Sequence, residues 1–146
     1  MAYLCGVARI LAIDYGTKRC GLAVTDPLQM IATPLTTVPT SGLMDYLRDY
    51  FAREQVGLII LGDPRRLDNS GSEMTHLANR LANKLQQKFP DIQIERYDER
   101  FTSQLAARAM IESGQSRKIK NDKGMLDRVS AAILLQNYLS AKTMNK

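Results

Sequence analysis

The chain has no tryptophan, one histidine and two cysteines among its 146 residues. One histidine cannot supply a multi-histidine metal site, and His76 lies in a polar stretch, so we do not expect it to act as a general base. Cys5 and Cys20 lack the spacing of metal ligands and are expected to be reduced and structural. Without tryptophan, and with most other aromatic residues at apparent core positions, the sequence shows no base-stacking platform for sequence-specific reading of a single strand.

Long hydrophobic runs are also missing. The stretch from residue 3 to residue 15 is interrupted by Arg9, is too short to span a bilayer and lacks the basic leader of a signal peptide. It therefore predicts a strand, and we expect a cytoplasmic protein that does not contact a membrane. The length and the apolar content of 45% suit a single domain, residues 1–146, with one core.

Charge is unevenly distributed along the chain. The first 113 residues hold 13 basic and 13 acidic side chains, whereas residues 114–146 hold seven and two, so the net charge of +5 comes from the C-terminal stretch. This asymmetry favours a polyanionic partner, of which nucleic acid is the commonest. A basic helix end and a solvated loop with no partner would explain the same charge, so the charge by itself leaves both interpretations open.

The apolar pattern predicts three strands followed by alternating helices and strands. Strands are expected over residues 8–14 and 20–25, within 31–38, over 58–61 and over about 92–97. Helices are expected from Leu43 to Phe51, from about residue 73 to Phe89, over about 102–112, and in the last segment, where Leu126, Val129 and Ile133 share one face. Gly16 lies in the turn between the first two strands, which indicates a hairpin.

Acidic residues occur in three separate segments, each beside an apolar run. Asp14 ends the first strand, Asp98 and Glu99 follow the fifth, and Asp127 is expected in the first turn of the last helix. Where strands pair in parallel their carboxyl ends share one edge of the sheet, and a packed helix can bring its own carboxylate there. Carboxylates at such an edge suit Mg²⁺, a hard ion that takes oxygen ligands and keeps waters for substrate phosphates to displace.

Four segments together resemble the YqgF family, also called RuvX. They are residues 14–18 (Asp-Tyr-Gly-Thr-Lys), 61–64 (Leu-Gly-Asp-Pro), 98–100 (Asp-Glu-Arg) and 126–132 (Leu-Asp-Arg-Val-Ser-Ala-Ala), in the family's order and spacing over nearly the whole chain. The resemblance implies an α/β fold of the ribonuclease H-like class, with a five-stranded mixed sheet in the order 3-2-1-4-5 flanked by helices. The family is related to the RuvC Holliday junction resolvases, and maturation of the 5′ end of pre-16S ribosomal RNA is attributed to it.

The resemblance carries the family's catalytic and metal-binding acids over to Asp14, Glu99 and Asp127. Adjacent strand residues point to opposite faces, so Asp98 and Glu99 are not expected to bind the same ion, and the family favours Glu99. Each acid also has a structural explanation when it is taken alone. Asp127 would stabilise a helix start, and the pair at 98–99 would form a salt-bridged loop.

Asp63 departs from the pattern, because we expect the family to have an apolar residue at this position. In ribonuclease H-like topology the fourth strand lies beside the first, so Asp63 is a candidate additional ligand of the metal or of its water. The alternative is that Asp63 caps its loop or pairs with Arg65, since short carboxylates often bind backbone amides in turns.

The implied reaction is hydrolysis of a phosphodiester bond assisted by one or two Mg²⁺ or Mn²⁺ ions. Structured RNA is the preferred substrate, with a ribosomal precursor particle as a candidate partner. Two roles remain open for Lys18 and Arg100: each could contact a substrate phosphate or form a structural ion pair. The residues expected to contact nucleic acid are basic: Lys18, Arg65, Arg66, Arg100, Arg117, Lys118, Lys120 and Lys123.

Other functions remain open. A Holliday junction resolvase would use the same carboxylates on branched DNA. Symmetric cutting of two strands usually requires a two-fold dimer, and we recognise no dimer interface in the sequence. A non-catalytic nucleic-acid-binding assembly factor would need only the basic segment. The Asp-x-Gly-Thr-Lys motif also resembles the phosphate loop of sugar kinases and actin-like ATPases, which close two such domains around a nucleotide; this chain is too short for a second.

Overall fold

The computed structural model describes residues 8–63, 73–98 and 123–144. In chain order the elements are β1 (Arg9–Asp14), β2 (Arg19–Thr25), β3 (Ala32–Pro39), the 3-10 helix η1 (Thr40–Gly42), α1 (Leu43–Arg53), β4 (Val56–Asp63), α2 (Glu73–Lys88), β5 (Gln93–Asp98) and α5 (Lys123–Met144). The helix expected over about 102–112 lies outside the described residues.

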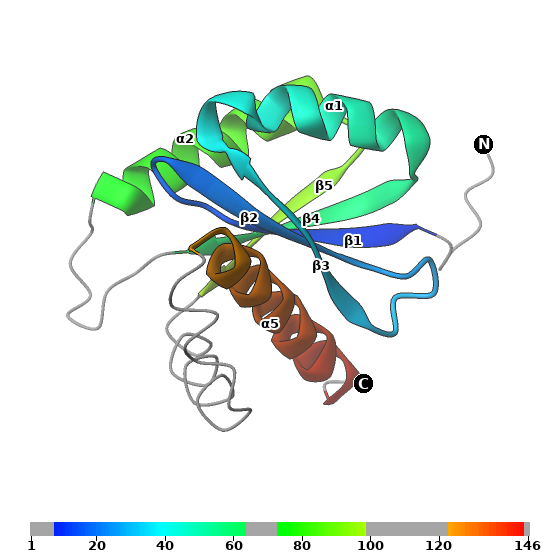
Figure 1. Ribbon diagram of the computed structural model, residues 1–146. Coiled ribbons are helices and arrows are strands. Elements are labelled where there is room, and N and C mark those ends of the chain that lie inside the picture. Colours follow the sequence, from blue (N-terminus) through cyan, green and yellow to red (C-terminus); the bar gives the residue numbers. More distant parts are fainter. Residues whose placement is uncertain (1–7, 64–72, 99–122, 145–146) are drawn as a thin grey trace.

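The five strands form one mixed sheet in the order β3-β2-β1-β4-β5, which confirms the predicted fold class. β2 pairs antiparallel with β1 and with β3, whereas β4 pairs parallel with β1 and with β5. The carboxyl ends of β1, β4 and β5 therefore lie at the same edge of the sheet. Helices α1 and α2 cover one face of the sheet and α5 covers the other (Figure 1).

The two faces of the sheet bury two separate hydrophobic clusters. On β1, Leu11 and Ile13 belong to the cluster under α1 and α2, while Ile10 and Ala12 belong to the cluster under α5. Because successive strand residues alternate between faces, a strand covered on both sides appears as a continuous apolar run in the sequence. Each fully buried leucine or isoleucine side chain contributes about 1.5–3 kcal/mol of transfer free energy.

Arg9 interrupts that apolar run without leaving a buried charge unpaired. Its Nε lies 3.3 Å from Oε2 of Glu54, just after α1, and its guanidinium also donates to the carbonyl oxygen of Thr25 at 3.0 Å. These contacts join the start of β1 to the end of α1 and the end of β2. The arginine is therefore compatible with a strand, as the sequence predicted.

Two boundaries differ from expectation. β4 spans Val56–Asp63 rather than residues 58–61, because β1 and β5 both pair along it. α5 begins at Lys123 and includes Gly124, ahead of the apolar periodicity that starts at Leu126. In the part of the chain that the structure describes, no helix has the length and apolar character needed to cross a membrane.

Candidate active site

Asp14 ends β1 at the edge where the parallel strands finish. Ile13 pairs with Leu61 of β4, so the next position on β1 lies beside Gly62, and on the other side Asp14 pairs with Gly21 of β2. Asp14 continues the alternation of Ile10 and Ala12, which places it on the α5 face of the sheet. The residue is half-buried. Its carboxylate thus stands at the open end of the strand, beside the buried core.

The turn after Asp14 is held by its glycine and by contacts from a distant residue. A side chain at Gly16 would collide with the carbonyl oxygen of Arg19, so the close approach in this hairpin requires glycine. Thr40 donates from its hydroxyl to the carbonyl oxygen of Gly16 at 2.6 Å and from its amide to the carbonyl oxygen of Lys18 at 3.0 Å. The turn is therefore anchored to the end of β3, and Lys18 is exposed on it.

The ends of β4 and β5 meet at the same edge. Asp63 and Asp98 are register partners in the parallel pairing of these two strands, and each is the last residue of its strand. The backbone at residue 63 is one position beyond Gly62, which lies beside Asp14. The topology thus brings the backbone positions of three acidic residues to neighbouring strand ends.

Asp127 lies in the second turn of α5, not in its first. The expectation of a first-turn position is wrong because α5 begins at Lys123, and the first turn contains no acidic residue. The attraction between an acid and the helix dipole falls off within the first turn. The explanation of Asp127 as a helix-start stabiliser is therefore weaker than the sequence suggested. The beginning of α5, drawn in orange, lies at the edge where β1 and β4 end (Figure 1).

The alternation along β5 distinguishes the two acids at its end. Ile94 packs against the α1 and α2 cluster, whereas Tyr97 packs against the α5 cluster. Glu95 also faces α5, since the hydroxyl of Tyr138 donates to its Oε2 at 2.9 Å. Side chains two residues apart on a strand share a face, so Asp98 alternates with Glu95 and Tyr97. Glu99, two positions after Tyr97 in the sequence, lies outside the described residues.

The contact between Tyr138 and Glu95 ties α5 to β5. Burial, followed by the hydrogen bond to Glu95, raises the pKa of Tyr138 to about 12. The phenol therefore stays protonated at neutral pH and remains a donor. This hydrogen bond and the edge-to-face packing of Tyr138 on Tyr97 fix the helix across the sheet, with its first turns toward the acidic edge.

A sequence model of a protein family, described as RuvX, Holliday junction resolvase, matches residues 8–141. The chain belongs to this family. A relative from Porphyromonas gingivalis is 53% identical over 133 residues, covering 91% of this chain and 96% of its own. One from Flavobacterium johnsoniae is 48% identical over 134 residues, covering 92% and 97%. Both carry the name "Putative pre-16S rRNA nuclease".

A solved structure supports the fold of this RuvX family member. RuvC of T. thermophilus, in complex with a Holliday junction substrate, superposes with a TM-score of 0.54 and covers 93% of this chain and 96% of its own. The sequences are 14% identical, so this likeness concerns the fold alone. It agrees with the ribonuclease H-like class that the sequence motifs predicted.

Among the predicted site residues of this RuvX family member, Asp14 and Lys18 have described side chains. Asp63, Asp98, Asp127 and Lys123 are placed by their backbone positions at strand ends and at the start of α5. Within the described residues, no three histidine, cysteine, aspartate or glutamate side chains gather closely enough to hold a metal. The other predicted residues lie outside the described ranges: Glu99, Arg65, Arg66, Arg100, Arg117, Lys118 and Lys120.

Sequence reasoning missed Thr40, which anchors the turn after Asp14. It lies 24 residues from Gly16, and no motif marks it. Of the three residues set aside as non-catalytic, His76 is exposed on α2, as expected for a surface residue, and Cys20 is buried in the cluster under α1 and α2. Cys5 lies outside the described residues.

Proposed function

We propose that this chain is a metal-dependent nuclease that hydrolyses a phosphodiester bond of pre-16S ribosomal RNA during maturation of its 5′ end. The observation that carries this proposal is the position of Asp14, half-buried on the α5 face at the edge where β4 and β5 also end. Membership of the RuvX family and the names of the relatives at 48% and 53% identity support it.

In this proposal Asp14, Glu99 and Asp127 hold one or two Mg²⁺ or Mn²⁺ ions. The donors fit such ions, because carboxylate oxygens suit hard cations. Cys20 packs into the opposite face of the sheet, and His76 is exposed on α2, so neither adds a softer donor beside Asp14. When bound, the metal would activate water and neutralise charge on the phosphate that is attacked.

The protein residues position the substrate and the ligands. Gly16 and Thr40 fix the turn that follows Asp14, which would hold the strand end that bears this carboxylate in place before substrate binds. Preorganised charges of this kind reduce the reorganisation that the reaction would otherwise require. Lys18, exposed on that same turn, lies where it can contact a phosphate oxygen of the substrate.

Recognition in this proposal depends on backbone charge and shape rather than on base reading. The remaining basic residues of the motifs and of the segment before α5 would contact phosphates of structured RNA, within a ribosomal precursor particle in the cytoplasm: Arg65, Arg66, Arg100, Arg117, Lys118, Lys120 and Lys123. Electrostatic contacts of this kind supply affinity without sequence preference.

Resolution of Holliday junctions is the second candidate function. The family's description favours it, and it would use the same carboxylates on branched DNA. The two functions differ in substrate and in symmetry, since a resolvase must cut two strands related by a two-fold axis.

The deciding experiment compares precursor 16S RNA with a four-way DNA junction, each incubated with Mg²⁺, with Mn²⁺ or with EDTA. We expect cleavage of the RNA that requires the metal, and an intact junction. Paired, symmetric cuts in the junction with no cleavage of the RNA would replace the proposal with the resolvase function. Tight RNA binding with cleavage of neither substrate would identify a non-catalytic assembly factor.

A further inference from the structure

A groove of about 290 Å³ lies on the sheet face opposite α5, between the turn after β1, the start of α1 and helix α2. Its apolar lining includes Tyr15, Leu43, Met44 and Leu81. Among the described residues that line it, the charged ones are Arg80 and Lys84, both from α2, and none is acidic. The groove therefore combines an apolar surface with positive charge.

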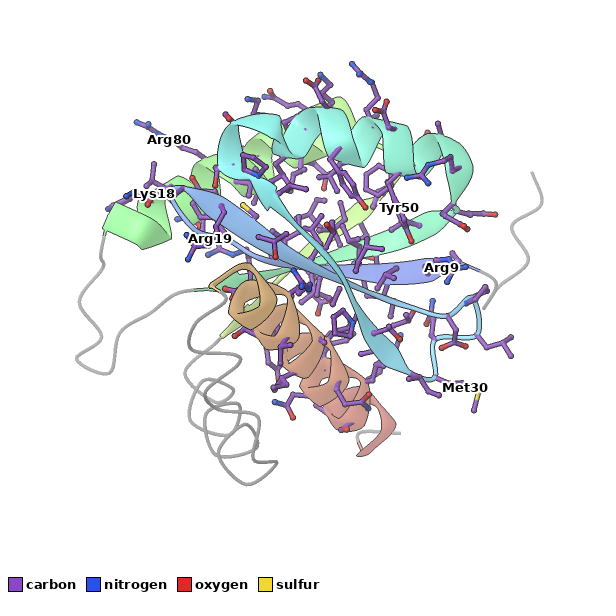
Figure 2. The ribbon with its side chains drawn as sticks, viewed as in Figure 1. Arg9, Lys18, Arg19, Met30, Tyr50 and Arg80 are labelled. Carbon is purple, nitrogen blue, oxygen red and sulfur yellow. The ribbon has the colours of Figure 1, made fainter. Side chains whose placement is uncertain are left out.

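The two cations of the groove lie on one face of α2. They are four residues apart, which brings side chains together on a helix, and both are exposed. Neither has an ion-pair partner among the residues that the structure describes, whereas Arg48 of α1 pairs with Asp45 and Asp49. Figure 2 shows Arg80 at the same end of the molecule as Lys18, on the turn after Asp14.

The groove and the candidate active site lie on the two sides of one strand end. Tyr15 packs against the cluster under α1 and α2 and lines the groove, while Asp14 continues the alternation on the α5 face. The Cα atoms of these consecutive residues are about 3.8 Å apart. A polymer that crosses this edge of the sheet would contact both places.

The composition of the groove indicates what it would hold. Arg80 and Lys84 are suited to a phosphate, and Tyr15 adds an aromatic side chain, the type of residue on which bases stack, to the lining. The volume equals that of about ten water molecules, which is enough for part of one strand.

We propose that this groove binds the single-stranded segment of RNA adjoining the cleaved bond, with a phosphate between Arg80 and Lys84 and the neighbouring base or ribose against Tyr15 and Met44. The role as a substrate site depends on the proposed nuclease function, but the binding itself can be measured without catalysis. The groove adds a second contact region, on the face that does not carry Asp14.

The test uses the double variant Arg80→Gln/Lys84→Gln of the full chain and a short single-stranded RNA in EDTA. We expect binding to weaken at least fivefold and the slope of log K against log salt to fall by roughly 0.7 for each phosphate that the variant no longer neutralises. The variant Arg48→Gln/Lys88→Gln is the matched control, because it removes the same two charges from exposed sites on α1 and α2 outside the groove. Equal effects of the two variants would overturn the proposal, as would an equal loss of binding to a blunt RNA duplex.

A second measurement separates this proposal from the nuclease function. With Mg²⁺ and precursor RNA, the groove variant should raise KM more than it lowers kcat, and the control variant should change neither. If the wild-type protein cleaves nothing but the groove variant still loses single-strand binding, the nuclease function fails and the groove stands. If the wild-type protein cleaves and the groove variant keeps its KM, the groove fails and the nuclease function stands.

Discussion

The hydroxyl of Thr40 donates a hydrogen bond of 2.6 Å to the carbonyl oxygen of Gly16, which joins the end of β3 to the turn that follows Asp14. The amide of Thr40 donates to Lys18 in the same turn, and the Sγ of Cys20 lies 3.5 Å from the Thr40 hydroxyl oxygen. Residues from three parts of the chain thus determine how the strand bearing Asp14 ends.

We expect Thr40→Val to lower the free energy of unfolding by about 1 kcal/mol, the usual value of one hydrogen bond, and to lower kcat more than it raises KM. The valine keeps the size of the side chain but removes its donor, so the turn after Asp14 loses an anchor. Thr40→Ser, which retains the hydroxyl, should restore kcat. A valine variant with wild-type kcat would show that this hydrogen bond does not orient the site.

Asp14→Asn should reduce metal-dependent cleavage to background while the protein remains folded. The change keeps the size of the side chain and removes the charge that would hold the cation. Asp127→Asn should act in the same way. Circular dichroism and thermal melting provide the folding control, and wild-type turnover by either folded variant would contradict the assignment of a metal nuclease.

Glu99 and Asp98 should respond differently to loss of charge. Glu95 and Tyr97 lie on the α5 face, and the family resemblance assigns Glu99 as the ligand, so Glu99→Gln is expected to abolish cleavage. Asp98→Asn is the matched control and should keep most of the activity. Metal titrations of both variants would show which residue is the ligand, and a loss confined to Asp98→Asn would reverse the assignment.

Asp63→Leu should leave the Mg²⁺ requirement unchanged and alter thermal stability. On β4, Ile59 and Leu61 pack on the α1 and α2 side, and residue 63 continues that parity, whereas Asp14 is on the α5 side. This arrangement favours the structural explanation of Asp63 over ligation. A raised Mg²⁺ requirement in the titration of Asp63→Leu would instead establish it as a ligand of the metal or of its water.

Asp26 provides a pH-dependent contribution to stability in the turn between β2 and β3. Its carboxylate accepts hydrogen bonds from the amides of Ile31, Met30 and Leu28 at 2.8, 2.9 and 3.2 Å, which lower the pKa of Asp26 below its ordinary value of 3.8. A lowered pKa in the folded state stabilises the protein above the unfolded-state pKa, and this stabilisation disappears as pH falls through the folded-state pKa.

Asp26→Ala should therefore be less stable than the wild type at pH 7, and the difference should shrink as the pH falls below about 4. Urea unfolding at pH 7, 5 and 3 measures the difference. The exposed variant Asp91→Ala serves as the control for the general effect of removing a carboxylate. A difference that stays constant over this range would show that the ionised form of Asp26 does not stabilise the turn.

The sequence by itself determined the positions of most strands and helices, to within one or two residues. β1 and β2 are continuous apolar runs bounded by polar turn residues. The position of such a strand can be identified from its own residues, without knowledge of its neighbours in the sheet. The motifs containing Asp14, Asp98, Glu99 and Asp127 also identified the family. The position of Asp127 in α5 was misjudged, because the helix includes Lys123 and Gly124, ahead of the apolar periodicity from which the sequence predicted it.

The tertiary structure alone decided how these parts meet. The face on which Asp14 lies, the contact from Thr40 to Gly16, and the groove that both Tyr15 and Arg80 line all depend on residues that are distant in the sequence or opposed in the sheet. Such juxtapositions depend on strand register and on the packing of helices against each face. A shift of one residue in the strand register would exchange the residues on the two faces of the sheet. No local sequence pattern around Thr40 or Arg80 indicates that the one lies beside Gly16 or that the other shares a groove with Tyr15.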